Sequence, residues 1–399
     1  MLELDLSPAI LFCFTQYVSQ ALDDRAQCDV IYTDFSKAFD QIDHGILLSK
    51  LRSSGFSQRL LDLLESYLIG RQQYVLLRGA RSRLVSVTSG VPQGSILGPL
   101  LFNIFVNNIA HDLDPGIQYL LYADDLKLFS RISSYNDCVV LQNNLNRIVK
   151  WCESNELGLN VGKCQVMSFG LVQDPVEYVY VIGDCRLSRP ETIRDLGVIF
   201  DHKLSFVDHI NHTVAAAYKF LGFIIRNSRD FHKGETLILL YNAFVRSRLE
   251  YAAIVWEPCY GTHINHIESV QRRFLKFLSF KTTGIYPYIG FPHDVLLRLH
   301  SFHSLETRRQ YRLLTFLHGL VNGKTLCPQI LHMLQYNTPR PASRRADFFY
   351  LPTPRTNKLK FSPLYRLCDS YDRVHGQIDI FNCTVASIRQ LILLPLSGS

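Results

Sequence analysis

Tyr122-Ala123-Asp124-Asp125 joins two apolar runs, residues 117–121 and residues 126–129. This pattern predicts a β-hairpin with Asp124 and Asp125 at its turn. An acidic pair in a turn is by itself more often a solvated loop tip than a functional site. A second acidic segment upstream, Asp34-Phe35-Ser36-Lys37-Ala38-Phe39-Asp40, reverses that interpretation.

Asp34 ends a short β-prone run, and pairing of the two strands would bring Asp34 and Asp124 together. Neighbouring carboxylates repel one another unless a cation lies between them, and oxygen ligands favour Mg²⁺ or Mn²⁺. In a two-metal site one ion activates an attacking hydroxyl and the other stabilises the leaving phosphates. Asp34 and Asp124 are the expected bridging ligands. Asp125 is a weaker candidate because adjacent strand residues point to opposite faces.

Two further segments fit phosphoryl transfer onto nucleic acid. Residues 89–102, SGVPQGSILGPLLF, predict a Gly/Pro turn that opens onto an amphipathic helix. Its glycines, including Gly94, allow close approach of the backbone to a ligand, and Gln93 is placed to hydrogen-bond a template base or an incoming nucleotide. Lys163 follows a second turn, where it would protonate the departing pyrophosphate or simply be a solvated lysine.

The ordered set of motifs resembles the reverse transcriptase of non-LTR retrotransposons, most of all the jockey-type elements, from about residue 11 to about residue 280. Each motif alone is weakly specific, whereas the whole series in this order is highly specific. The matching residues are Asp34, Lys37, Ala38, Phe39, Asp40, His44, Gln93-Gly94-Ser95, Leu97-Gly98-Pro99, Tyr122 to Asp125, Leu159-Asn160, Lys163, Leu196-Gly197-Val198, Asp201, Leu204, Leu249-Glu250-Tyr251, Trp256, Pro258, Ile267-Glu268 and Gln271 to Phe274.

The resemblance implies roles that spacing alone does not give. Phe39 lies where the family has the residue that excludes a ribose 2′-hydroxyl, although a core aromatic is the competing interpretation. The backbone carbonyl of Phe35 is implied as a further metal contact. Leu196, Gly197 and Val198 match the segment that grips the primer terminus.

The fold expected is α+β: a polymerase palm, with an antiparallel sheet backed by helices, followed by a mainly helical thumb and C-terminal region. Cys138, Leu141, Leu145, Ile148 and Cys152 alternate steps of three and four, which predicts one buried face of a helix behind the sheet. The predicted segments are a fingers remnant at 1–28, the palm at 29–205, a thumb-like region at 206–290 and a helical, loop-rich region at 291–399.

Nucleic acid is the expected partner. On the last thumb helix Arg272, Arg273 and Lys276 lie away from the apolar face, where they would contact a template-primer backbone or form a solvated face. The resemblance implies an RNA template, a DNA primer, deoxynucleoside triphosphates and two divalent ions. The net charge of +7 permits such binding without demonstrating it.

Composition agrees with a folded intracellular protein in the cytoplasm or nucleus. The ten cysteines include no Cys-x-x-Cys pair, and no signal peptide, membrane span or targeting segment stands out. Only 33 residues precede Asp34. The family has a longer fingers region there and an endonuclease domain, so the sequence reads as an N-terminally truncated reverse transcriptase with impaired activity.

Two alternatives remain open at this stage. One is a catalytically inactive or domesticated remnant that binds nucleic acid without extending it. The other is a metal-dependent nuclease built from the same carboxylates, which leaves the Gln93-Gly94-Ser95 signature unexplained.

Overall fold

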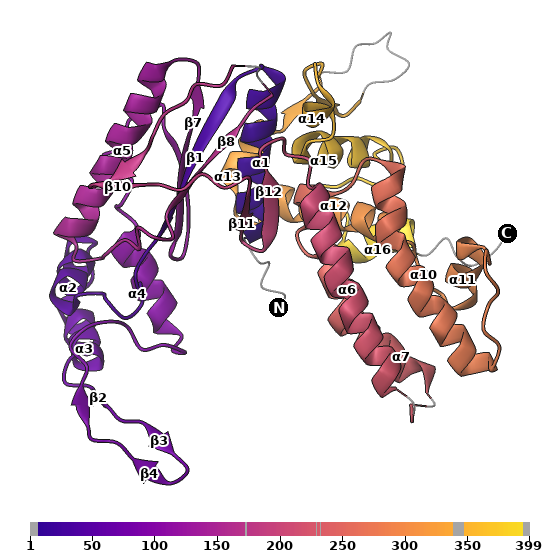
Figure 1. Cartoon of the computed structure of the whole chain (residues 1–399), viewed down its shortest axis with the longest axis horizontal. Helices are drawn as coiled ribbons and strands as arrows, with labels where there is room; N and C mark the ends of the chain where they lie inside the picture. Colours follow the sequence, from indigo (N-terminus) through magenta and orange to yellow (C-terminus); the bar gives the residue numbers. More distant parts are fainter. Residues whose placement is uncertain (1–6, 172–173, 229, 232, 338–346, 394–399) are drawn as a thin grey trace. The chain divides into compact units, whose positions relative to one another are not determined.

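A computed structural model describes residues 7–171, 174–228, 230–231, 233–337 and 347–393. The chain divides into two compact units (Figure 1). We call Arg25–Glu191 the sheet unit, and Met1–Asp24 together with Thr192–Ser399 the helical unit. Each unit is described by itself.

The sheet unit is built on four strands in the order β6-β7-β1-β8, and each neighbouring pair is antiparallel. Its main elements are β1 (Gln27–Asp34), α2 (His44–Ser53), α3 (Gln58–Leu68), α4 (Leu97–Val106), β6 (Gln118–Tyr122), β7 (Asp125–Ile132), α5 (Tyr135–Ser154) and β8 (Gln165–Phe169). The predicted hairpin of residues 117–129 is therefore present as β6 and β7, but its turn is Ala123-Asp124, and Asp125 begins β7 instead of lying in the turn.

Helix α5 backs one face of this sheet. Cys138, Leu141, Leu145, Ile148 and Cys152 are all buried, as their spacing predicts. They share a core with Ile31 of β1 and with Leu126 and Leu128 of β7. Since strand side chains alternate between faces, these residues fix which side of β1 and β7 is turned away from α5.

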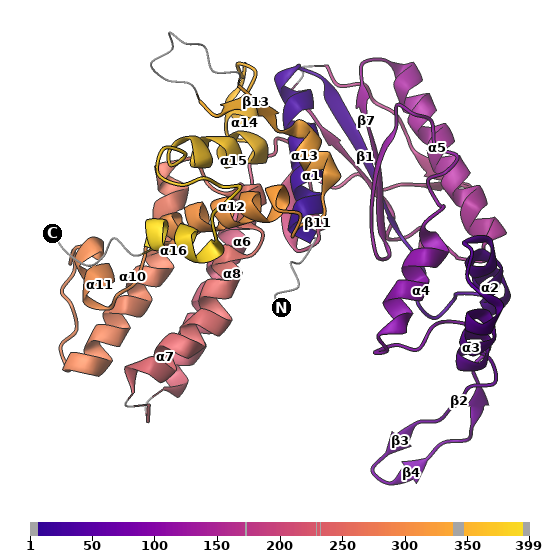
Figure 2. The same ribbon diagram turned by 180° about the vertical axis from the view of Figure 1, so that it is seen from behind.

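Four two-residue strands form an arm beyond α3 (Figure 2). Its ladders pair β2 (Gln72–Gln73) with β5 (Val85–Ser86) and β3 (Leu76–Leu77) with β4 (Ala80–Arg81). Residues 72–86 are all exposed, so the arm has no core of its own. A third small ladder in the sheet unit pairs β9 (Val181–Ile182) with β10 (Cys185–Arg186).

The helical unit contains a short hairpin and a series of helices. In chain order its elements are α1 (Ser7–Asp23), β11 (Thr192–Asp195), β12 (Val198–Asp201), α6 (Val207–Asn227), α7 (Gly234–Tyr241), the π-helical turn η1 (Asn242–Arg246), α8 (Ser247–Glu250), α9 (Ala253–Trp256), α10 (Gly261–Thr283), α11 (His293–Leu299), α12 (Leu305–Val321), α13 (Pro328–Met333), β13 (Gln335–Tyr336), β14 (Phe349–Tyr350), α14 (Asn357–Lys360), α15 (Pro363–Asp372) and α16 (Val385–Leu393). The thumb-like region predicted at 206–290 contains α6 to α10.

Helix α1 packs within the helical unit, against α9, α13, α14 and α15. The carboxylate of Asp23 accepts hydrogen bonds from the backbone N–H groups of Arg355 and Thr356, at 2.9 and 2.6 Å. Gln16 accepts another from Leu364 N–H at 3.1 Å. The segment predicted as a fingers remnant thus belongs to the same compact unit as the C-terminal helices, and the predicted boundaries at 28 and 205 differ from the unit boundaries at 24 and 191.

The architecture confirms the predicted α+β class, with an antiparallel sheet backed by α5 and a mainly helical remainder. Within the described ranges, no helix is both long and apolar enough to cross a membrane.

Candidate active site

Asp34 and Asp125 are direct cross-strand partners, because the β1–β7 ladder ends at this pair. Residues opposite one another in an antiparallel pair project from the same face, with Cα atoms about 4.5–5.5 Å apart. This face is the one turned away from α5, since Ile31 and Leu126 occupy the other. Strand alternation predicts Asp125 to be the weaker candidate for a metal ligand, whereas the observed register places Asp125 beside Asp34.

Asp124 occupies the two-residue turn between Tyr122 and Asp125, which are themselves paired. Ala123 precedes it with a φ of 52°, a left-handed conformation that costs a non-glycine residue roughly 1–2 kcal/mol. Asp124 precedes Asp125 by one Cα step of about 3.8 Å, so the Cα atoms of all three aspartates lie within about 1 nm. The turn therefore places Asp124 next to the Asp34–Asp125 pair along the backbone.

Lys163 reaches the same carboxylate from another segment. Its Nζ lies 3.3 Å from Asp34 Oδ2. The turn that carries it is tied to β1 because Asn160 N–H donates to Asp34 carbonyl oxygen at 2.7 Å and Lys163 N–H donates to Asn160 carbonyl oxygen at 2.9 Å. Asn160 is thus a positioning residue that the sequence argument matched to a motif without giving it a role.

The donor set fits a hard divalent cation. Asp34 Oδ2 is buried and accepts no hydrogen bond from the described residues, so its charge is met only by the Lys163 ammonium. In the described part of the chain, no three His, Cys, Asp or Glu side chains are grouped as a ready metal cage. Mg²⁺ is commonly held by one or two carboxylates together with waters and substrate phosphates, so the Asp34–Asp125 pair suits it.

Gln93 is held by Asp40, the other acidic residue of the first motif. Its Nε2 donates to Asp40 Oδ1 at 2.8 Å, and Ser89 Oγ donates to Asp40 carbonyl oxygen at 2.8 Å. Helix α4 begins at Leu97, so Gln93 and Gly94 lie in the preceding loop rather than in the first helical turn. Backbone hydrogen bonds from Gly90 N–H to Ile42 carbonyl oxygen and from Val91 N–H to Phe39 carbonyl oxygen, both 2.8 Å, fasten the same loop to residues 39–42.

Phe39 and Phe35 have different environments. Phe39 is partly buried and stacks on Phe102 of α4, with ring centroids 4.5 Å apart and an interplanar angle of 25°. Phe35 is buried in the core, so its backbone rather than its ring is the part available to a ligand. The stacking partner of Phe39 lies 63 positions away in the sequence, and local patterns gave no sign of it.

The predicted primer-grip residues form the turn of the β11–β12 hairpin in the helical unit. Leu196 and Gly197 have φ values of 43° and 85°, which match the twist of a tight hairpin. Tyr251 donates its hydroxyl to Leu196 carbonyl oxygen at 2.9 Å, and a Cβ on Gly197 would lie 3.0 Å from the Tyr251 ring. Val198 is buried. The hairpin turn is therefore fixed by Tyr251, the tyrosine of the Leu249-Glu250-Tyr251 motif.

His209 supports the same hairpin and makes its stability pH-dependent. Its Nδ1 accepts a hydrogen bond from Ile199 N–H, and burial, with smaller contributions from His212 and Arg194, lowers the pKa of His209 to about 4. Since the unfolded pKa is 6.5, the unfolded state binds the proton more tightly below that pH.

We expect the free energy of unfolding to fall by about 2 kcal/mol between pH 7 and pH 5, because over this range the imidazole takes up a proton in the unfolded state, with a pKa of 6.5, and stays neutral in the folded state, with a pKa of about 4. Chemical denaturation at both pH values measures this loss. His209→Gln keeps an acceptor without a proton to titrate and is expected to show a smaller pH dependence. An equal dependence in both proteins would assign the effect to other groups.

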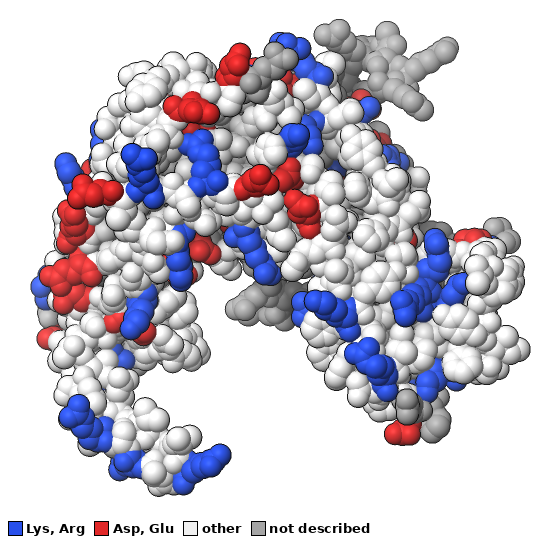
Figure 3. Space-filling view, in the orientation of Figure 1, with Lys and Arg blue, Asp and Glu red and all other residues white. Residues whose placement is uncertain are grey.

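The predicted thumb cations lie on α10. Arg273 is exposed and its guanidinium lies 5.8 Å from the centre of the Tyr218 ring. Arg272 is half-buried, and Lys276 donates to Tyr288 carbonyl oxygen at 2.9 Å. Figure 3 shows Lys and Arg side chains gathered over the helices α6, α7 and α10. Their contact with nucleic acid stays a prediction.

Comparison with known proteins gives the family. A family model described as "Reverse transcriptase (RNA-dependent DNA polymerase)" matches residues 5–225. "Probable RNA-directed DNA polymerase from transposon BS" of Drosophila melanogaster is 29% identical over 279 residues, which are 66% of this chain and 30% of that protein. "RNA-directed DNA polymerase from mobile element jockey" of Drosophila funebris is 28% identical over 287 residues, 68% of this chain and 31% of that protein.

The chain thus spans less than a third of the length of these relatives. Among solved structures, telomerase from Candida tropicalis in complex with a fragment of telomeric RNA aligns at a TM-score of 0.40 and 11% identity, covering 99% of this chain and 53% of that one. The family match covers more than half of the chain and contains all three aspartates, the Gln93 loop and the β11–β12 hairpin. The chain belongs to the reverse transcriptase family, and its relatives identify it as a member of the non-LTR retrotransposon group.

Proposed function

We propose that this chain extends a DNA primer on an RNA template with deoxynucleoside triphosphates. The observation that carries the proposal is the register of β1 and β7, which sets Asp34 opposite Asp125 on the sheet face away from α5, with Asp124 adjacent in the turn. Carboxylates converging from two strands are what a metal-dependent nucleotidyltransferase requires of its protein. The family to which the chain belongs uses divalent metals in general.

In this proposal Asp34, Asp124 and Asp125 hold two Mg²⁺ or Mn²⁺ ions, with Phe35 contributing its carbonyl oxygen. When bound, such ions lower the pKa of an attacking hydroxyl and neutralise charge on the phosphates. Lys163, already within 3.3 Å of Asp34, would turn to the departing pyrophosphate and donate a proton to it. Its exposed side chain has the freedom for that movement.

The loop of Gln93 and Gly94 would orient the incoming nucleotide. Asp40 holds the Gln93 amide in place through one hydrogen bond, leaving its carbonyl oxygen as an acceptor for a base or sugar. Leu196, Gly197 and Val198 would contact the primer terminus, and Arg272, Arg273 and Lys276 the template-primer backbone. An intracellular place of action, in cytoplasm or nucleus, follows from these partners.

Primer extension on an RNA template tests the proposal. The full chain is incubated with an annealed DNA primer, deoxynucleotides and Mg²⁺, and product length is measured. We expect addition of nucleotides that is abolished by chelation of the metal and restored by Mg²⁺ or Mn²⁺. Hybrid binding without any addition would favour the inactive, nucleic-acid-binding alternative, and strand cleavage without addition would favour a nuclease.

Phe39 gives a prediction about sugar choice. Phe39→Val shortens the side chain that the resemblance places against the ribose, so ribonucleotides should be accepted more readily. Steric discrimination of this size is worth about 1–3 kcal/mol, and we expect the kcat/KM ratio of ribonucleotide to deoxynucleotide to rise by roughly 10-fold or more.

The matched control is Tyr119→Val, which removes an exposed aromatic ring from β6 of the same unit. The kcat/KM ratio of ribonucleotide to deoxynucleotide in this control should equal that of the parent chain. If Phe39→Val loses activity toward both sugars equally, the Phe39–Phe102 stack has a packing role and does not discriminate.

A further inference from the structure

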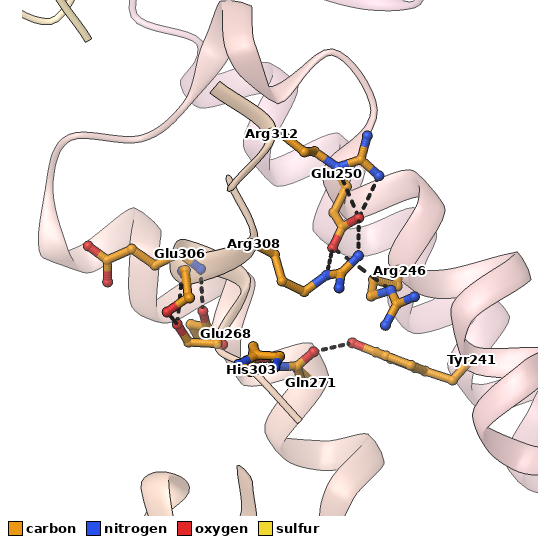
Figure 4. Close-up of polar contacts among 11 residues, drawn as sticks. Tyr241, Arg246, Glu250, Glu268, Gln271, His303, Glu306, Arg308 and Arg312 are labelled. Atoms are coloured by element: carbon orange, nitrogen blue, oxygen red, sulfur yellow. Dashed lines mark hydrogen bonds and ion pairs between the residues drawn. The ribbon is translucent and has the colours of Figure 1, made fainter. Parts of the chain in front are cut away.

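Three arginines of the helical unit converge on one buried carboxylate, Glu250, at the end of α8 (Figure 4). Arg308 of α12 donates to both Glu250 oxygens through Nε and Nη2. Arg312, one helical turn further, donates through Nη2 at 2.7 Å and Nε at 3.2 Å. Arg246 Nε lies 3.8 Å from Glu250 Oε1. We call Arg246, Arg308 and Arg312 the arginine cluster.

The cluster carries more positive charge than its carboxylate neutralises. Glu250 is only 2% exposed. Burial by itself would raise the pKa of Glu250, yet the hydrogen bonds and charges of Arg308 and Arg312 lower it. Burial and the charge of Arg308 also lower the pKa of Arg246, with Glu250 opposing that change. One anion therefore faces three cations that repel one another.

Glu268, the other buried carboxylate labelled in Figure 4, has partners outside the arginine cluster. Glu268 accepts from His293 Nε2 at 3.2 Å and from Glu306 N–H at 3.1 Å. No contact between Glu268 and the arginine cluster is present among the described ion pairs. The surplus of two positive charges is thus left for solvent or for an anion.

The arginine cluster has more N–H donors than Glu250 can accept from, which suits a phosphate. Three guanidinium groups carry about 15 N–H donors, whereas the two oxygens of a carboxylate accept only about four hydrogen bonds. The side chains of Arg308, Arg246 and Arg312 are 20%, 22% and 46% exposed, so the cluster reaches the surface. Planar guanidinium groups bind phosphate oxygens in pairs, with geometry that lysine does not offer.

The backbone around Arg246 adds a separate observation. Arg246 ends the π-helical turn η1, which separates α7 from α8. Such turns are rare and occur frequently at functional sites, because they shift the side chains that follow out of the regular helical register. Arg246, at the end of this turn, forms its ion pair with the same Glu250 carboxylate that Arg308 of α12 contacts.

We propose that the arginine cluster is a phosphate-binding site, oriented by Glu250, and that its ligand is a phosphodiester group of nucleic acid. The source of the phosphate rests on the proposed function, whereas the site itself does not. Glu250 would keep the three guanidinium groups together before the ligand arrives, so that little side-chain freedom is lost on binding.

Arg312→Gln is the variant of choice, because Arg312 is the most exposed member and its loss leaves the Arg308–Glu250 pair intact. Binding of an RNA–DNA hybrid to the full chain is measured by fluorescence anisotropy between 50 and 300 mM KCl, with Ca²⁺ in place of Mg²⁺. Each phosphate contact contributes about 0.7–0.9 to the slope of log K against log salt. We expect the slope to become shallower by about that amount and affinity at 0.15 M to fall about fivefold.

Arg298→Gln is the matched control. It makes the same change at an exposed arginine of α11 that is paired with Asp294 in the same unit. Its slope should equal that of the parent chain. Arg312→Lys keeps the charge without the planar guanidinium group. We expect it to bind the hybrid more weakly but with the salt slope of the parent chain. A parental slope in this variant would also show that a changed slope in Arg312→Gln does not come from a folding defect.

A second arm uses inorganic phosphate alone. The melting temperatures of the parent chain and of Arg312→Gln are measured in phosphate and in chloride at equal ionic strength. Loss of the phosphate response in Arg312→Gln with an unchanged hybrid slope would support the anion site but overturn nucleic acid as its source. If Arg312→Gln changes only the melting temperature, with parental slope and phosphate response, the arginine cluster is a structural ion network and the proposal is wrong. These binding readouts need no nucleotide addition, so they stay informative if polymerisation is absent.

Discussion

Asp34→Asn should lower nucleotide addition about 1,000-fold or more. The substitution keeps the shape of the side chain and removes the charge that, in the proposed function, would hold a metal ion beside Asp125. Metal-ion catalysis supplies several kcal/mol of transition-state stabilisation, and each 1.36 kcal/mol is a factor of ten in rate. Steady-state primer extension at saturating deoxynucleotide measures the loss.

The same substitution should leave the fold and hybrid binding nearly unchanged. The Asp34–Lys163 ion pair is partly exposed, at 3.3 Å, and such pairs contribute about 0–1 kcal/mol to stability. Asp62→Asn is the matched control: the same chemical change on an exposed residue of α3 in the sheet unit, where parental activity is expected. Addition by Asp34→Asn within tenfold of the parent chain would take Asp34 out of the metal site.

The local elements were predictable from the sequence because their signals are local. The spacing of Cys138 to Cys152 and the apolar runs around Tyr122 identify α5 and the β6–β7 hairpin without any tertiary information. The acidic residue types likewise pointed to metal chemistry. These inferences depend only on periodicity and on ligand preference.

The register was not predictable, and it decides which acidic residue faces Asp34. A slip of one residue exchanges the two faces of a strand, so Asp124 and Asp125 cannot be ranked from alternation alone. The turn that sets the register places Ala123 at a φ of 52°, where Gly, Asn or Asp is the usual residue. No turn signal in the sequence marks that choice.

Long-range contacts were also beyond the sequence. Asp23 contacts Arg355 and Thr356, more than 330 positions away, which joins α1 to the C-terminal helices. Glu250 meets Arg308 across 58 positions. The sequence around Arg308 does not indicate this contact, because a buried carboxylate partner that is distant in the chain adds no periodic pattern.

Gly90→Ala is expected to be the most damaging substitution of a small residue in the sheet unit. Gly90 has a φ of 81°, and an added Cβ would lie 2.7 Å from both Cα and the carbonyl oxygen of Asp40 and 2.8 Å from Phe39 carbonyl oxygen. Those atoms are backbone and cannot rotate away. The left-handed conformation costs roughly 1–2 kcal/mol and overpacking a further 1–3 kcal/mol, so we expect a total loss of about 3 kcal/mol.

Activity should fall with stability in this variant, because Gly90 fastens the loop that carries Gln93. Its N–H donates to Ile42 carbonyl oxygen at 2.8 Å, and its own carbonyl oxygen accepts from His44 at 2.8 Å and Arg71 at 2.6 Å. Displacing Gly90 moves the loop away from Asp40 and with it the Gln93 amide.

Gly94→Ala separates the two causes. Gly94 has nearly the same φ, 78°, but no described atom lies within 4 Å of its added Cβ. Only the conformational cost remains, and we expect a loss of about 1 kcal/mol. Chemical denaturation of both variants measures the difference, which isolates the close approach of Gly90 to residues 39–40. Equal losses would mean that the loop relaxes around the new methyl group. The contact between the first acidic segment and the Gln93 loop would then not be the constraint that holds Gln93 in place.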